Sequence, residues 1–235
     1  MTPTARTPNS EDPQQRAPSN REDPSARWWR IGLGALVAAA LVAIGGAGAI
    51  ILGLGGNHYP AAASVDAGFA RDMSTHHRQA VLMAGLARDR SADPEVALIA
   101  YDIETVQLSQ VGQLQGWLAL WGLSQSTGEP MSWMSGHEHA GTSGRSEVGL
   151  MPGMADADEL DELRAAQGPA FDVLFLRLMI RHHQGGTQMA NYAAEQAEID
   201  ALRTLARSMA ETQAAEIATL TDMLTARGGT PLPAP

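Results

Sequence analysis

The chain has 235 residues, of which 44% are hydrophobic, and its 16 basic residues, all Arg, are outnumbered by 26 acidic residues to give a formal net charge of −10. This acidic balance argues against a general nucleic-acid-binding protein, because the phosphate backbone attracts basic surfaces. The sequence contains no Cys, which excludes disulfides, thiolate metal sites and Cys nucleophiles.

The first elements in chain order are a polar tail and an apolar segment. Residues 1–30 are rich in Pro, Ser, Gln, Asn and Arg, and because so few apolar residues cannot offset the entropy cost of ordering, they predict a disordered tail. Residues 31–54 are all Ile, Leu, Val, Ala or Gly. A helix of that length, rising about 1.5 Å per residue, is long enough to cross a bilayer. The segment therefore predicts one transmembrane helix.

The residues that flank the apolar segment indicate its orientation. Arg27 and Arg30 precede it, beside Trp28 and Trp29, and no positive charge follows it closely. Positive charge is enriched on the cytoplasmic side of membrane helices, so we expect the tail in the cytoplasm and the remainder outside the cytoplasmic membrane. The alternative is a signal peptide cleaved near the three Ala at 61–63, which would release a secreted protein.

The remainder, residues 60–228, predicts an all-α domain. Apolar residues recur at helical spacing in four long segments. These segments are residues 65–88, 94–121, 170–196 and 200–227. A capping sequence at 156–159 opens a further short helix. Residues 123–155 are rich in Met, His and Gly without sustained periodicity, and they predict a long loop.

An internal duplication relates the two halves of this domain at an offset of 106 residues. Eight of the nineteen ungapped positions from 66 to 84 are identical to their counterparts. The pairs are Asp66/Asp172, Phe69/Phe175, Arg71/Arg177, Met73/Met179, His76/His182, His77/His183, Met83/Met189 and Ala84/Ala190. Two hairpins with one apolar stripe each bury these stripes most simply against one another. The sequence thus predicts a four-helix bundle made of repeat 1 (about 64–122) and repeat 2 (about 156–228).

Four His and four Met fall on the predicted core-facing sides of this bundle. They are His76, His77, Met73 and Met83 in the first copy and His182, His183, Met179 and Met189 in the second. Imidazole nitrogen suits copper, zinc, iron and nickel, whereas thioether sulfur selects copper. The set therefore predicts a copper ion first. The alternative is that the His are hydrogen-bonded core residues and the Met are packing residues.

The long loop carries further residues that can bind metal. These are His137, His139, Met151 and Met154. They fit a second, mobile capture site and equally a plain solvated loop, and the sequence leaves both open.

Motifs of common enzymes are missing from the sequence. It has no Gly-rich phosphate loop, Gly-x-Ser-x-Gly elbow or His-Glu-x-x-His zinc motif. The Glu-x-x-His motifs of di-iron bundles do not occur either. We expect no catalytic activity and no organic cofactor.

The repeated motifs resemble the domain of unknown function 305 family over about residues 64–226. The resemblance is carried by residues 69–77 (FARDMSTHH), 171–185 (FDVLFLRLMIRHHQG) and 151–154 (MPGM). It implies a ferritin-like four-helix bundle, secreted or membrane-anchored, and some members are associated with copper binding and copper tolerance through Met and His. Activity is mostly unassigned in the family.

Family features carry over to Asp172, Phe175, Met179, His182, His183 and Met189 and to their counterparts in the first copy. Three of the positions at which the first copy departs from the second lie at or near these motifs. Gln79 and Ala80 replace Gly185 and Gly186, and Asp72 replaces Leu178. We therefore expect the first site to differ from the second in access or affinity.

Together these features predict a single-pass membrane protein whose extracytoplasmic bundle binds copper for sequestration or homeostasis, with no protein partner identified. One alternative is an envelope interaction or scaffold bundle with structural His pairs. Another is a metal-dependent oxidoreductase, for which the sequence lacks the usual carboxylate ligands.

Overall fold

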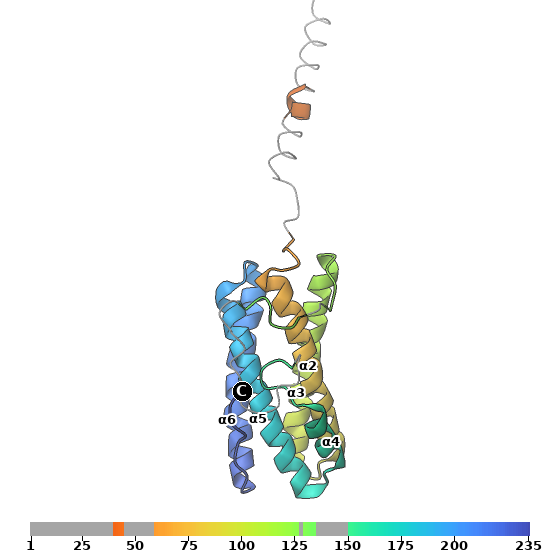
Figure 1. The fold of residues 1–235 in the computed structure, drawn as a ribbon, viewed down its shortest axis with the longest axis vertical. Coiled ribbons are helices and arrows are strands. Elements are labelled where there is room, and N and C mark those ends of the chain that lie inside the picture. Colours follow the sequence, from red (N-terminus) through yellow and green to blue (C-terminus); the bar gives the residue numbers. More distant parts are fainter. Residues whose placement is uncertain (1–39, 45–58, 127–128, 135–149) are drawn as a thin grey trace, which may run out of the picture. The chain divides into compact units, whose positions relative to one another are not determined.

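The computed structural model describes residues 40–44, 59–126, 129–134 and 150–235 (Figure 1). The chain divides into two units, residues 1–58 and 59–235. In the first unit the described residues, 40–44, are helical. The predicted tail, the rest of the predicted transmembrane segment 31–54, and His137 and His139 lie outside the described residues. Within the described ranges, no helix is both long enough and apolar enough to cross a membrane.

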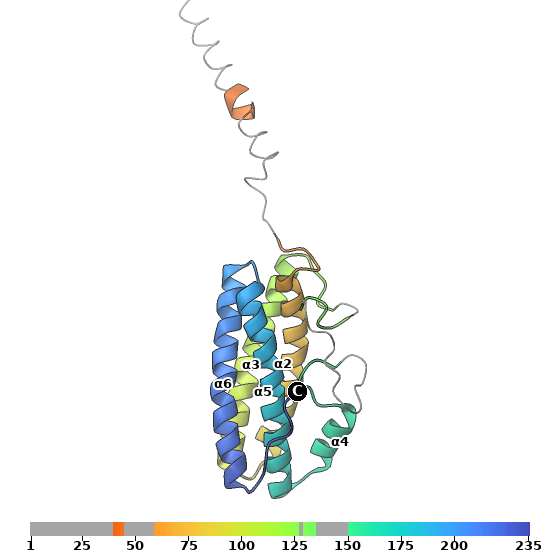
Figure 2. The ribbon, with the colours of Figure 1, turned by 60° about the vertical axis from the view of Figure 1, so that its left-hand side comes forward.

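The described part of the second unit is built from helices, without any strand. The helices are α2 (Val65–Arg90), α3 (Pro94–Leu120), α4 (Ala157–Ala165), α5 (Gly168–Gln196) and α6 (Asp200–Ala226). Helices α2 and α3 form one hairpin, α5 and α6 form the other, and the hairpins meet along α2 and α5 (Figures 1 and 2). The short α4 contacts α2 and α5. The all-helical prediction is confirmed.

Helices α2, α3 and α4 begin at residues whose side chains accept hydrogen bonds from free backbone N–H groups. Ser64 accepts a hydrogen bond from the Ala67 N–H at the start of α2, and Asp93 accepts from Glu95 before α3. At α4, Asp156 and Glu159 form a reciprocal capping box. Each cap of this kind contributes about 0.5–2 kcal/mol to helix stability.

Helix α6 is capped by a residue from the other hairpin. Its own N-cap residue, Ile199, has no side chain that can accept a hydrogen bond. Asp66 of α2 accepts instead, from the N–H groups of Ile199 at 2.9 Å and Glu198 at 3.1 Å. The buried Asp66 is therefore a capping residue that fastens the two hairpins together.

Two apolar clusters form the core, one toward each end of the bundle. One combines the early part of α2 with the late part of α5 and contains Phe69, Met73 and Met189. The other combines later α2 with early α5 and contains Met83 and Phe175. Because the early part of one helix packs with the late part of the other, α2 and α5 run antiparallel. The two His pairs lie on these helices between the clusters.

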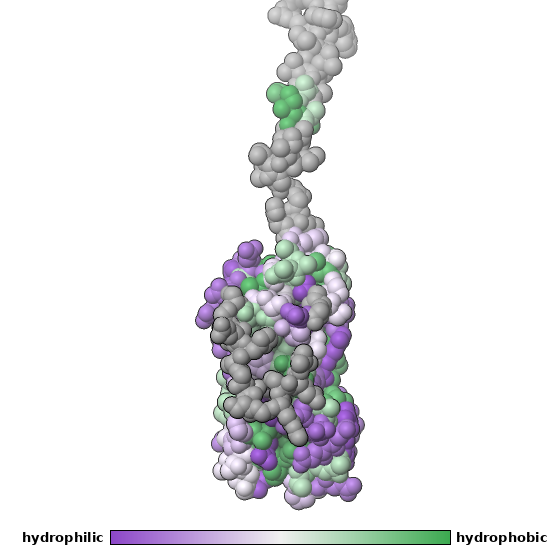
Figure 3. Space-filling view, in the orientation of Figure 1, coloured by the Kyte–Doolittle hydropathy of each residue, from purple (hydrophilic) through white to green (hydrophobic). Residues whose placement is uncertain are grey.

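The outer surface differs between the two hairpins. On α3, Leu98, Tyr101, Leu108 and Leu120 are each more than half exposed, at 51–62%. The positions 106 residues later in α6 are Thr204, Arg207, Ala214 and Ala226. An outward apolar row therefore occurs on α3 without a counterpart on α6. By contrast, on the face shown in Figure 3, hydrophilic side chains gather at the lower right, over α4.

Candidate metal centre

Two equivalent His side chains meet where α2 crosses α5. The rings of His76 and His182 lie with their centroids 3.8 Å apart and their planes inclined by 34°. Both side chains are buried, and His182 Nε2–H donates a hydrogen bond to the backbone carbonyl of His76 at 3.1 Å. Since the two residues are counterparts in the repeat, the hairpins bring the duplicated motif into contact with itself.

The other two His turn toward the second helix of their own hairpin. The ring of His77 lies 6.4 Å from that of His76, and Nε2 lies 2.8 Å from Gln110 Oε1 on α3. The ring of His183 lies 6.3 Å from that of His182, and Nε2 lies 2.8 Å from Glu216 Oε2 on α6. The structure therefore brings two imidazoles together directly and holds the outer two apart on either side.

All four rings have Nε2 against an oxygen atom, which fixes their tautomers. His76 Nε2 lies 3.0 Å from the Pro152 carbonyl oxygen, and the other three face the His76 carbonyl, Gln110 and Glu216 as described above. An oxygen acceptor requires a proton on Nε2, so the basic lone pair lies on Nδ1.

Three of these Nδ1 atoms are buried without a hydrogen-bond partner. They belong to His76, His77 and His183. Buried polar atoms are nearly always hydrogen-bonded, so a group of three unpaired acceptors calls for an explanation. A metal ion bound at Nδ1 is one such explanation, because ligating His commonly donates its other ring N–H to a carbonyl or carboxylate.

Burial also keeps three of the four imidazoles neutral. Removal from water lowers the pKa of His76 to about 4, although the Pro152 carbonyl opposes the shift. Burial and the neighbouring His76 lower the pKa of His77 to about 3, and the same causes lower the pKa of His182 well below its ordinary value. At neutral pH these rings carry no proton on Nδ1, so a metal ion need not displace one.

A segment of the long loop covers the central ring pair. A Cβ added at Gly185 would lie 1.9 Å from the Pro152 carbonyl oxygen, and one at Gly153 would lie 2.3 Å from the Arg181 carbonyl oxygen. Gly153 also has φ +78°, which favours Gly. These two glycines let residues 151–155 lie directly on α5, where the Pro152 carbonyl reaches His76.

The same segment is fastened to α2 by the residue that replaces Gly185 in the first copy. The Gln79 amide donates to the Ala155 carbonyl at 2.8 Å and accepts from the Ala155 N–H at 2.7 Å. The difference between the copies thus has a structural reason, since one helix gives the segment room and the other holds it.

The predicted Met residues lie on both sides of the His pairs. Met73 and Met189 are fully buried in one core cluster, together with the buried Met151, and the half-buried Met154 packs against that cluster. Met83 and Met179 are fully buried in the other cluster. Each side of the paired rings therefore has two thioethers from the repeat.

Carboxylate ligands are scarce around the rings. Among the described residues, no three His, Asp or Glu side chains gather closely enough to hold a metal ion. Coordination in this arrangement would therefore combine ring nitrogen with thioether sulfur, or would follow a tilt of the rings.

Sequence reasoning did not identify Gln110, Glu216 or Pro152 as partners of the His. A usable signal was present, because Gln110 and Glu216 each follow their His by 33 residues. Because Gln110 and Glu216 differ in residue type, this pair is not among the identical residues of the two copies. The Pro152 contact depends on the path of the loop, which helical periodicity does not describe.

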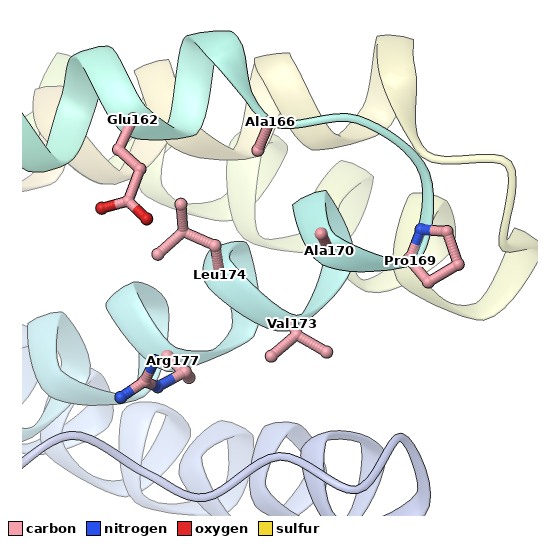
Figure 4. A pocket seen from close by; sticks show the side chains of 7 residues that line it. All are labelled: Glu162, Ala166, Pro169, Ala170, Val173, Leu174 and Arg177. Carbon is pink, nitrogen blue, oxygen red and sulfur yellow. The ribbon is translucent and has the colours of Figure 1, made fainter.

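The structure also contains an open pocket away from the His pairs. Its volume is about 390 Å³, and it lies where α4 ends and α5 begins (Figure 4). It is lined by Glu162, Ala166, Pro169, Ala170, Val173, Leu174 and Arg177. None of the predicted metal-binding residues lines it, so this pocket is separate from the candidate metal centre.

Comparison with known proteins gives a family and several related structures. The family model described as "Domain of unknown function (DUF305)" matches residues 66–224. A DUF305 crystal structure from Streptomyces coelicolor, described as a candidate secreted protein, is 41% identical, with coverage of 74% of this chain and 99% of that chain and a TM-score of 0.66. A DUF305 fragment from Deinococcus radiodurans is 32% identical, with coverage of 68% and 95% and a TM-score of 0.56.

A protein named CopM is also similar. Its Cu(II)-bound structure is 25% identical, with coverage of 69% of this chain and 96% of that chain and a TM-score of 0.54. CopM structures are also known in Cu(I)-bound and silver-bound forms. No curated protein sequence matches the chain.

Proposed function

We propose that this chain, which belongs to the DUF305 family, binds copper ions through the Nδ1 atoms of its buried His pairs. The observation that carries the proposal is the set of three buried Nδ1 atoms without a partner on rings whose Nε2 atoms are all held by oxygen. Such rings are oriented, and each has an Nδ1 lone pair that can bind a metal ion.

Copper is the metal that best fits the available donors. Without Cys, the soft donors of the bundle are Met thioethers, and two of them lie on each side of the rings. Thioether sulfur favours Cu(I), and imidazole binds both copper oxidation states. The similarity to CopM, which is known in Cu(I)-bound and Cu(II)-bound forms, supports this choice.

We propose further that copper is cargo, which the protein sequesters or buffers without catalysis. The flanking charges of residues 31–54 support a location outside the cytoplasm, with the bundle either anchored by this segment or secreted after cleavage. The description of the Streptomyces coelicolor relative supports the secreted alternative. We also propose that the bundle is ferritin-like and that His137 and His139 of the loop belong to a second metal-capture site.

Titration of the purified full chain with Cu(I) and Cu(II) tests the proposal. We expect stoichiometric binding, and we expect it to be lost when His76, His77, His182 and His183 are all replaced by Ala. Phe69→Ala is a suitable control, because it removes a fully buried side chain from α2 without removing an imidazole. Unchanged copper binding in the fourfold variant, or no binding by the native chain, would contradict the proposal.

A second candidate function is favoured by the outward apolar row on α3. Leu98, Tyr101, Leu108 and Leu120 form an exposed apolar surface that suits contact with another protein. In that case the bundle is a scaffold and the His pairs are structural. Replacing Leu98 and Leu108 by Glu would then abolish association, whereas the fourfold His variant would be less stable without any change in metal binding.

A further inference from the structure

The outer His of each hairpin is held in the same way by a different chemical group. His77 Nε2 lies 2.8 Å from an amide oxygen of Gln110, and His183 Nε2 lies 2.8 Å from a carboxylate oxygen of Glu216. Both partners follow their His by 33 residues and occupy equivalent positions of α3 and α6. The two ring orientations are thus matched, and charge is the difference between them.

Among the described residues, no Arg competes with His183 for the Glu216 carboxylate. Glu216 forms an ion-pair contact with His183, and no Arg of the described residues lies within ion-pair distance of it. The His183 side chain is fully buried, and that of Glu216 is 15% exposed. In such a poorly solvated environment the negative charge of Glu216 acts strongly on the neighbouring ring.

Carboxylate and amide acceptors affect a metal-binding imidazole differently. A carboxylate that accepts the Nε2–H raises the basicity of the ring and with it the strength of the bond from Nδ1 to a metal. It also attracts the cation directly, and this attraction grows with the charge of the ion. A neutral amide orients the ring equally well but supplies neither effect.

We infer that Glu216 is a positioning residue that makes His183 the stronger metal ligand of the two outer His, so that the second hairpin binds copper more tightly than the first. The preference is larger for Cu(II) than for Cu(I), because the doubly charged ion gains more from the carboxylate. This inference rests on the proposed function, since it ranks ligands of the same copper centre.

The substitution Glu216→Gln tests the inference and should leave the fold intact. Gln110 shows that an amide can hold the same ring nitrogen in the equivalent place. We expect Cu(II) affinity at the tighter site to fall by about 10–100-fold, the effect typical for a partner that orients a ligand, and Cu(I) affinity to fall less. Gln110→Glu should strengthen the first hairpin instead.

Exchanging the two partners provides the sharpest control. In the native chain, His183→Ala should weaken Cu(II) binding more than His77→Ala does. In the double variant Gln110→Glu, Glu216→Gln, this order should reverse. A purely structural role for Glu216 would alter the unfolding midpoint without reversing the order, and that result would overturn the inference.

A readout without metal separates this inference from the proposed function. In the native, copper-free chain, the Nε2 proton resonance of His183 should lie downfield of that of His77, and Glu216→Gln should remove the difference. Equal resonances in the native chain would refute the inequality of the two rings. If the resonances differ but the native chain binds no copper, the proposed function fails and the ranking of metal ligands fails with it. If copper binds and Glu216→Gln changes no affinity, the inference fails alone.

Discussion

The two hairpins of the bundle have equivalent core residues and equivalent His pairs, but they differ in their contacts with the long loop. Equivalent Phe, Met and His residues lie in equivalent places of α2 and α5. Several of the differing positions instead contact the long loop. Asp72 accepts hydrogen bonds from the Met131 N–H and the Trp133 Nε1–H, both at 2.7 Å, whereas its counterpart is Leu178.

Gly68 is a second differing position on α2 that contacts the long loop. A Cβ added at Gly68 would lie 2.3 Å from the Trp133 ring, and the counterpart of Gly68 is Leu174, which lines the pocket of α5. On α2 and α5 the duplicated Phe, Met and His residues thus lie at the candidate metal centre, whereas Gly68, Asp72, Gln79 and Gly185 contact its cover. Changes to the shared residues should affect both hairpins alike, whereas changes to these four residues should affect the cover.

The largest effect is expected from truncating the shared Phe residues. Phe69 and Phe175 are both fully buried, so Phe69→Ala and Phe175→Ala should each lower the free energy of unfolding by about 3–5 kcal/mol. Phe69 also packs edge-on against Trp133 with ring centroids 5.9 Å apart, so its loss should be the greater by about 1 kcal/mol. Urea denaturation measures both values, and a loss below 1 kcal/mol for either would contradict the equivalence of the two cores.

The next effect is the pH dependence of the copper-free protein. The folded-state pKa values of His76 and His77 are about 4 and about 3, so the unfolded chain binds more protons once the pH falls below about 6.5. Stability is therefore complete above that pH and is lost as pH falls toward 4. At pH 5 the loss should be about 2 kcal/mol for each such His. His77→Asn should flatten the profile, and an unchanged slope would show that His77 is solvated.

A smaller effect is expected from making the covered position of α5 bulkier. Gly185→Ala would place a Cβ 1.9 Å from the Pro152 carbonyl oxygen, and because backbone atoms must shift, we expect a cost of about 1–3 kcal/mol. The matched control is Gly116→Ala on α3, where a Cβ would meet nothing within 4 Å. That change should stabilise the chain by about 0.5–1 kcal/mol, since Ala favours helices over Gly. Equal effects would show that residues 151–155 do not rest on α5.

Periodicity and duplication predicted the helices and the burial of the His pairs because both depend on local spacing along the chain. The contact between His76 and His182 followed from the same reasoning, since equivalent residues of two packed repeats meet near their symmetry axis. All four His were predicted on the core-facing sides of the bundle, but the partners of His77 and His183, which are Gln110 and Glu216 within their own hairpins, were not predicted.

The cover of the site could not be derived in the same way. Its contacts join Pro152 to His76 and Trp133 to Asp72 across 76 and 61 residues, and they depend on the path of an aperiodic loop. Gly185 and Gln79 were recognisable only as departures from the repeat. Gly185 leaves room for residues 151–155 and Gln79 forms hydrogen bonds with them, and both roles depend on the backbone path of the loop.

Nitrogen NMR of the ring atoms tests the central claim most directly. In the copper-free full chain at pH 7, His76, His77 and His182 should appear as neutral rings, and all four rings should carry a proton at Nε2. On addition of Cu(I), which is diamagnetic, the Nδ1 resonances should shift. The Nε2 atoms should keep their protons. Shifts confined to Nε2, or no shift of any ring nitrogen with copper bound, would contradict the account.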